Sequence, residues 1–225
     1  MIDEVAPYAV AVKPQSAFFE VRGWEGVRAF ERVCDHAREA GLLVVADTKR
    51  GDISTTAEAY AEAVLAHADA ATVNPWLGTD SIEPYLAHCR NGKGIFVLVK
   101  TSNPGGREIQ DARLADGRRV WELVAEYVRA WGEESIGDHG RSSVGAVMGA
   151  TYPEELATGR ALLPQAPFLL LGVGAQGATV EDCAPAFSGG LALVSTSRAI
   201  IFAESPAAAA ERLAREVWDA AHAAA

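Results

Sequence analysis

Short apolar runs alternate with amphipathic segments along almost the whole chain. The runs have the length and the uniformly apolar character of buried strands, and they fall at residues 8–13, 42–47, 70–74, 94–100, 144–149, 168–172 and 191–195. Between them, apolar residues recur every three or four positions, as Trp24, Val27 and Phe30 do in the first such segment. This alternation of strands and helices predicts an α/β protein with a parallel sheet covered by helices.

Seven predicted strands are compatible with two architectures. An open doubly wound sheet accepts seven, whereas a (β/α)₈ TIM-type barrel has eight. Polar and glycine-rich residues follow the predicted strands throughout the chain. A barrel collects such residues at the carboxyl ends of its strands, so this arrangement favours the barrel. No linker divides the chain, and we predict a single domain over residues 1–225.

Several local signals predict where helices and loops begin. Residues 55–58 and 80–83 match the capping box, in which Thr or Asp is followed three positions later by Glu. Thr179 is expected to start a short helix, and residues 15–20 are expected to form a loop. Residues 101–118 form a polar connection that is long for a compact domain, which is typical of a lid.

Composition and charge narrow the functional classes. The chain of 225 residues is 49% hydrophobic and 22% charged, as soluble globular proteins are. A net charge of −10 and the lack of a basic cluster argue against a nucleic-acid-binding surface. No signal peptide is recognisable and no apolar run reaches the roughly 20 residues of a membrane span, so we expect a cytoplasmic protein with no membrane contact. The widely spaced Cys34, Cys89 and Cys183 suggest buried free thiols rather than a disulfide framework or a zinc site.

The second predicted strand ends in a concentration of opposite charges. Asp47, Lys49 and Asp52 place two carboxylates and one ammonium within a few residues. Asp47 and Lys49 are two positions apart, so on an extended backbone they point to the same face. Parallel α/β proteins place their catalytic residues at such strand-to-helix junctions. The plainer alternative is a solvated turn with a surface ion pair, which is common and weak.

Other strand ends carry further candidates. Lys13 closes the first predicted strand, Ser102 follows the fourth, Gln176 lies in a glycine-rich segment after the sixth, and Arg198 follows the seventh. Because the carboxyl ends of parallel strands gather at one end of a barrel, we expect these residues to surround one site with the charged stretch. Taken singly, Lys13 could be a solvated strand end, Ser102 and Gln176 turn residues, and Arg198 a member of a surface ion pair.

The order and spacing of these residues resemble a known family. Asp47-x-Lys49-x-x-Asp52-Ile53-x-x-Thr56 is similar to the signature of orotidine 5′-phosphate decarboxylase. The surrounding sequence agrees, with the segments Lys49-Arg-Gly-Asp-Ile, Thr101-Ser-Asn-Pro-Gly and Gly172-Val-Gly-Ala-Gln-Gly. The match runs from about residue 9 to about residue 203, and it resembles the bacterial branch that carries the Lys-Arg-Gly-Asp-Ile form.

The resemblance implies a (β/α)₈ barrel that is usually a homodimer and has its active sites at the dimer interface. The implied reaction is the conversion of orotidine 5′-phosphate (OMP) to UMP and CO₂ in de novo pyrimidine biosynthesis, without a metal or a cofactor. Lys13, Asp47 and Lys49 would form a charged catalytic array beside the substrate. Asp52, also catalytic, would reach into the partner's site.

The resemblance also implies a set of substrate-binding residues. Ile53 and Thr56 would lie beside Asp52 at the partner's site. Ser102 would contact the pyrimidine ring, while Gln176 and Arg198 would hold the phosphate.

One departure from the family concerns the start of the barrel. The family has a strand before the one that ends in Lys13, and an aspartate at its end binds the ribose. We therefore expect an N-terminally short barrel without this first strand, and Asp3 is not a substitute because no strand precedes it.

Two other functions are weighed against the decarboxylase. Sugar-phosphate decarboxylases and hexulose-phosphate synthases share an Asp-x-Lys-x-x-Asp motif but use Mg²⁺. They need an additional acidic ligand at a neighbouring strand end, where this chain has Asn74. The other alternative is a non-catalytic nucleotide- or phosphate-binding barrel that lacks strand 1.

Overall fold

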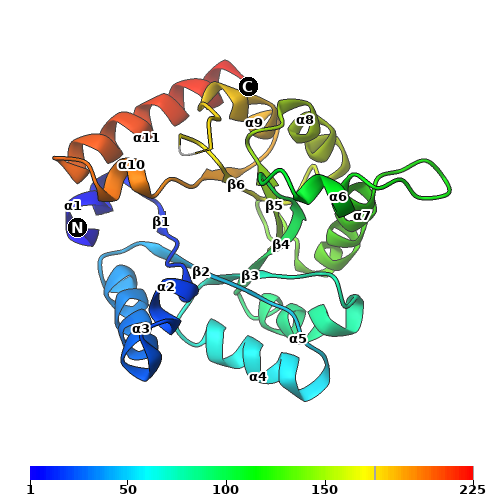
Figure 1. Ribbon diagram of the computed structural model, residues 1–225, viewed down its shortest axis with the longest axis horizontal. Helices are drawn as coiled ribbons and strands as arrows, with labels where there is room; N and C mark the ends of the chain where they lie inside the picture. Colours follow the sequence, from blue (N-terminus) through cyan, green and yellow to red (C-terminus); the bar gives the residue numbers. More distant parts are fainter. Residues whose placement is uncertain (175, 225) are drawn as a thin grey trace.

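Seven parallel strands form one curled sheet in the computed structural model, which describes residues 1–174 and 176–224 (Figure 1). The strands follow one another in chain order around the sheet. They are β1 (Ala11–Val12), β2 (Leu43–Arg50), β3 (Ala70–Val73), β4 (Gly94–Lys100), β5 (Val144–Gly149), β6 (Phe168–Leu171) and β7 (Ala192–Val194). The prediction of seven parallel strands is confirmed, although the first strand is shorter than the apolar run 8–13.

Helices surround the sheet on its outer side (Figure 1). The α-helices are α1 (Ile2–Val5), α2 (Ser16–Glu20), α3 (Gly23–Glu39), α4 (Ser54–Leu65), α5 (Thr79–Cys89), α6 (Gly106–Gln110), α7 (Val120–Gly132), α8 (Pro153–Leu162), α9 (Ala184–Phe187), α10 (Arg198–Ile201) and α11 (Pro206–Ala223). The short 3₁₀ helices are η1 (Ala6–Tyr8), η2 (Glu133–Ser135) and η3 (Glu181–Cys183). No helix among the described residues is long and apolar enough to cross a membrane.

The ring of strands is open between its first and last members. Within the residues that the structure describes, β1 and β7 are the edge strands of the sheet and are not paired with each other. The amino-terminal α1 and η1 pack against the carboxyl-terminal α11 at this side of the molecule (Figure 1). The observed fold is thus a curled, incomplete barrel, as expected for a chain without the first strand of the family.

The core has an inner and an outer part because side chains alternate between the two faces of each strand. Val45, Phe96, Val147 and Leu169 pack together inside the curled sheet. A larger cluster lies between the sheet and its helices. The three cysteines are buried and free, as predicted, and burial raises the pKa of each thiol to about 12.

The helix starts differ from the local predictions. Helix α4 begins after Ile53 and α5 begins after Gly78, and neither N-cap residue makes a side-chain hydrogen bond, so both predicted capping boxes are wrong. Ser54 and Gly78 have positive φ angles of 51° and 87°, so at each site the chain enters the helix through a backbone turn.

Two further segments depart from the sequence-based expectations. Residues 15–20 contain α2 rather than a loop. No helix starts at Thr179, whose N–H donates to the Asp182 carboxylate at 2.8 Å, and the helical turn η3 begins two residues later.

Candidate active site

A buried carboxylate between two lysines lies at the carboxyl ends of the first two strands. Asp47, near the end of β2, is only 2% exposed. Its Oδ2 accepts a hydrogen bond from Lys13 Nζ at 2.5 Å, and its Oδ1 accepts one from Lys49 Nζ. The structure therefore brings together three of the predicted site residues, and a solvated surface ion pair does not describe them.

A fourth residue, which the sequence reasoning missed, completes this array. Thr72 of β3 is fully buried, and its Oγ1 donates to Asp47 Oδ1 at 3.0 Å. The same oxygen accepts the backbone N–H of Lys49, also at 3.0 Å. A single threonine in an apolar strand carries no sequence signal, so only the pairing of β2 with β3 reveals it.

The two lysines control the ionisation of Asp47. Burial raises the pKa of a carboxyl group because it disfavours the charged form. The ammonium groups of Lys13 and Lys49 outweigh that effect and hold the pKa of Asp47 below its ordinary value. Asp47 is therefore a carboxylate at neutral pH, and it faces the site as a fixed negative charge between two cations.

An irregular strand end places Lys49 beside Asp47. The register between β2 and β3 shifts between Ala46 and Arg50, and Lys49 has a φ of +48°, in the left-handed region. Arg50 then fixes the end of the strand, since its guanidinium pairs with Glu20 of α2 and lies 5.3 Å from the ring centre of Tyr60 of α4. The lysine thus lies on a backbone bulge that is held from both flanking helices.

The loops after β4 and β6 converge at a second part of the site. An added Cβ at Gly172 would lie 3.2 Å from Gln176 Oε1 and 3.3 Å from Ser102 Cβ. Gly172 also has a φ of +105°, which favours glycine. Ser102 and Gln176 therefore lie close to each other, on either side of Gly172.

The connection expected to be a lid is anchored at its base. Lys100, the last residue of β4, is 1% exposed and pairs with Asp111 beyond α6. Gln110 bonds both the N–H and the hydroxyl of Thr101. The guanidinium of Arg107 lies 4.8 Å from the ring centre of Tyr152 in the next loop. The Lys100–Asp111 pair was not predicted from the sequence, because Lys100 has the pattern of an ordinary residue at the end of a strand.

The remaining predicted residues do not join the array within this chain. The Asp52 carboxylate accepts the N–H of Ile53 at 2.8 Å, and Lys49 pairs with Asp47 instead. Ile53 and Thr56 are exposed, and so is Arg198, the first residue of α10.

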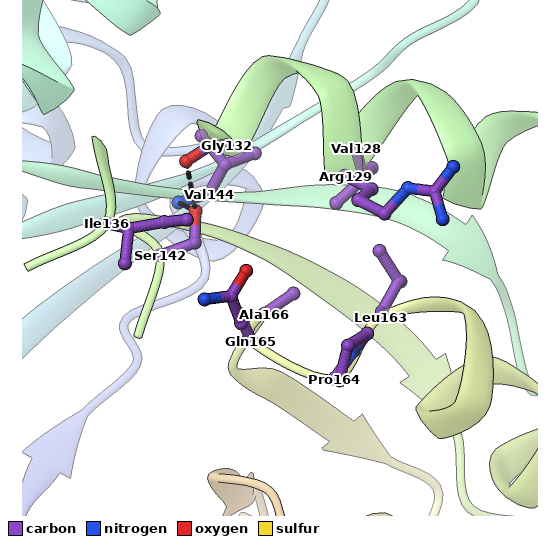
Figure 2. A pocket seen from close by; sticks show the side chains of 10 residues that line it. All are labelled: Val128, Arg129, Gly132, Ile136, Ser142, Val144, Leu163, Pro164, Gln165 and Ala166. Atoms are coloured by element: carbon purple, nitrogen blue, oxygen red, sulfur yellow. Dashed lines mark hydrogen bonds between the residues drawn. The ribbon is translucent and has the colours of Figure 1, made fainter. Parts of the chain in front are cut away.

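Two pockets have linings that do not include the charged array of Lys13, Asp47, Lys49 and Thr72. One of about 280 Å³ opens between the end of β4 and helices α6 and α7, and it includes Trp76 and Trp121. The other, near the start of β5, has a volume of about 20 Å³, which is room for about one water molecule. Figure 2 shows Ser142 there, bonded to Gly132. Within residues 1–174 and 176–224, no three His, Cys, Asp or Glu side chains gather to hold a metal ion.

The fold and the site define a parallel α/β-barrel enzyme with charged residues at the carboxyl ends of its strands. The family model described as "Orotidine 5'-phosphate decarboxylase / HUMPS family" matches residues 1–213. The chain belongs to this family.

Relatives named orotidine 5′-phosphate decarboxylase match most of the chain. The protein from Deinococcus radiodurans is 51% identical over 210 residues, which cover 90% of this chain and 75% of the relative. The protein from Rhodopirellula baltica is 46% identical over 215 residues, which cover 90% of this chain and 71% of the relative. Among solved structures, Leishmania donovani OMP decarboxylase matches with a TM-score of 0.85 and 38% identity over 98% of this chain and 85% of that one. The fold and family expectations from the sequence are thereby confirmed.

Proposed function

We propose that this chain decarboxylates OMP to UMP and CO₂, the step that forms UMP in pyrimidine biosynthesis, with its own charged residues and without a metal or an organic cofactor. One observation carries the mechanism: a buried carboxylate, Asp47, is held between the ammonium groups of Lys13 and Lys49. The identity of 51% to a protein named for this reaction supports the substrate.

The array fits the electronic demand of the reaction. Loss of CO₂ breaks the bond between C6 and the carboxylate carbon and leaves the electron pair on C6. Without an electron sink, the protein can stabilise this charge only by electrostatics and by a proton donor. Lys49 Nζ supplies both, since its positive charge faces the developing carbanion and its proton then completes the C6–H bond. The amine left on Lys49 regains a proton from water.

Asp47 acts on the leaving group and on the donor. Next to the substrate carboxylate, its negative charge repels a group that disappears from the site as neutral CO₂. At the same time it orients Lys49, while Lys13 balances its charge. The lowered pKa of Asp47 keeps it ionised at neutral pH, as both roles require.

Substrate contacts are assigned to the other strand ends. Ser102 binds the pyrimidine, and Gln176, its neighbour across Gly172, binds the phosphate together with Arg198. The exposed guanidinium of Arg198 is available for two parallel hydrogen bonds to phosphate oxygens. Binding energy at the phosphate, far from the bond that breaks, then helps to lower the barrier.

A second copy of the chain completes each site. Ile53 is 48% exposed and Thr56 is exposed. The Asp52 carboxylate lies at the surface, in the turn that leads into α4. In a homodimer these residues reach the partner's array. Mixing Lys49→Ala with Asp52→Asn protein tests this, because a dimer with one chain of each variant has one intact site. About half of the dimers in an equal mixture are of this kind, so the mixture should recover about a quarter of the wild-type rate. If the mixture is as inactive as the separate variants, the shared site is wrong.

The decarboxylase itself is tested by following the absorbance of OMP in the presence of a chelator. Wild type is expected to turn over OMP, and Lys49→Ala to lose the activity. Lys93→Ala is the matched control and is expected to keep full activity. Lys93 lies just before β4, at the amino ends of the strands, where its Nζ donates to the Ala68 carbonyl at 2.8 Å.

Each other outcome identifies a different function. Wild-type protein that binds UMP but releases no CO₂ is a non-catalytic binding barrel. An activity on sugar phosphates that the chelator abolishes would place the chain with the Mg²⁺-dependent members of the family.

A further inference from the structure

We propose that Thr72 is a positioning residue for the charged array, and that its hydroxyl fixes both the carboxylate of Asp47 and the backbone of Lys49. The proposal rests on the proposed function, because it assigns Thr72 to the same reaction. Thr72 is contributed by β3, whose other side chains are apolar.

The directions of both hydrogen bonds at Thr72 are determined by its partners. An ionised carboxylate can only accept, so the hydroxyl proton points to Asp47 Oδ1, 3.0 Å away. A backbone N–H can only donate, so the N–H of Lys49 points to a lone pair of the same oxygen at 3.0 Å. The side chain is 0% exposed, and water therefore cannot take over either bond.

These bonds close a ring that holds Lys49 at both ends. Its Nζ binds Asp47 Oδ1, and its N–H binds the hydroxyl that also binds Asp47 Oδ1. The ring fixes the position of the Lys49 ammonium relative to the Asp47 carboxylate. Proton delivery to C6 depends on that position.

The backbone of Lys49 needs this support. Its φ of +48° is unfavourable for a residue with a side chain. The register shift between Ala46 and Arg50 also removes the regular β3 partner of its N–H. The Thr72 hydroxyl is the group that replaces that partner, so it stabilises the bulge as well as the carboxylate.

Thr72→Val tests the proposal because valine has nearly the same shape and lacks the hydroxyl. We expect kcat to fall about 10- to 100-fold, the range found when an outer hydrogen-bond partner of an active-site group is removed. The dissociation constant of UMP should change less than about threefold, because the proposed pyrimidine and phosphate contacts do not pass through Thr72. Thr72→Ser retains the hydroxyl and should restore most of kcat.

Ser142→Ala is the matched control. Ser142 is also buried, and it lies just before the amino end of β5, whereas the array lies at the carboxyl ends of the strands. Its hydroxyl donates to the Gly132 carbonyl and accepts the N–H of Val144 (Figure 2). This variant should lower the melting temperature and leave kcat unchanged. If Thr72→Val does not fold, Thr72→Cys, whose thiol is a weak donor, carries the same expectation.

Three results would overturn the proposal: a Thr72→Val kcat within about twofold of wild type, equal losses in the Val and Ser variants, or a parallel loss of UMP affinity. A crystal structure of Thr72→Val provides a readout that does not depend on activity. It should show Lys49 outside the left-handed region or a rotated Asp47 carboxylate, and an unchanged array would refute the positioning role. Wild-type protein without OMP turnover would refute the proposed function alone.

Discussion

Replacing Lys13 with methionine tests the electrostatics of the array most sharply. The substitution keeps most of the aliphatic length and removes the ammonium that binds Asp47 Oδ2 at 2.5 Å. The Lys13 side chain is 15% exposed and that of Asp47 is 2% exposed, so water compensates little for the lost charge. Removing one partner of a buried pair costs about 3–5 kcal/mol, and we expect about 3 kcal/mol at pH 7 because Lys49 still binds Oδ1.

The same substitution should change the pH dependence of stability. In wild type the pKa of Asp47 is lower in the folded than in the unfolded protein. The ionised carboxylate therefore stabilises the fold at pH values above its pKa in the unfolded chain, near 4. This stabilisation is lost as the pH falls through the pKa of Asp47 in the folded protein. Without Lys13, only Lys49 opposes the effect of burial, so the pKa of Asp47 in the folded protein rises. The variant then takes up a proton at a higher pH than wild type, and the stability difference between the two shrinks as the pH falls.

Urea unfolding of both proteins between pH 7 and pH 4 measures this difference. Lys93→Met is the control, because Lys93 binds a backbone carbonyl and no carboxylate, and its effect should not depend on pH in this range. The reasoning is refuted if Lys13→Met loses less than about 1 kcal/mol at pH 7, or if its loss is the same at every pH.

Two further substitutions test packing around the barrel. Arg160 is 6% exposed and donates five hydrogen bonds to four backbone carbonyls, so Arg160→Met should lower the free energy of unfolding by about 3 kcal/mol and leave kcat unchanged. An unchanged urea midpoint would contradict this. An added Cβ at Gly149 would lie 2.9 Å from Ser102 Cα, so Gly149→Ala should raise the KM for OMP by about tenfold through displacement of the Ser102 loop. Gly137→Ala, whose Cβ would meet only one atom at 3.9 Å, should leave KM unchanged.

The strands were predictable because buried parallel strands are apolar on both faces. The runs at 94–100 and 144–149 coincide with β4 and β5 for this reason. The starts of α4 and α5 were not predictable, since Ser54 and Gly78 lead into these helices with positive φ angles rather than with side-chain caps. Helix α2 was missed because five residues are too few to display a helical period.

The charged part of the site was visible in the sequence because Asp47 and Lys49 are separated by one residue. The contact of Asp47 with Lys13, 34 positions away in the chain, depends on the pairing of β1 with β2. Thr72 was not visible, because its importance arises from the register shift between β2 and β3 and from burial of its hydroxyl. The roles of Asp52, Ile53 and Thr56 depend on a second copy of the chain and stay predictions.

The most direct test of the account is the fate of OMP labelled with ¹³C in its carboxylate and incubated with the protein and a chelator in ²H₂O. We predict one labelled CO₂ for each UMP formed, one deuterium at C6 of that UMP, and neither product with Lys49→Ala. Labelled OMP that remains intact with abundant wild-type protein, or UMP formation that Lys49→Ala leaves unchanged, would contradict the account.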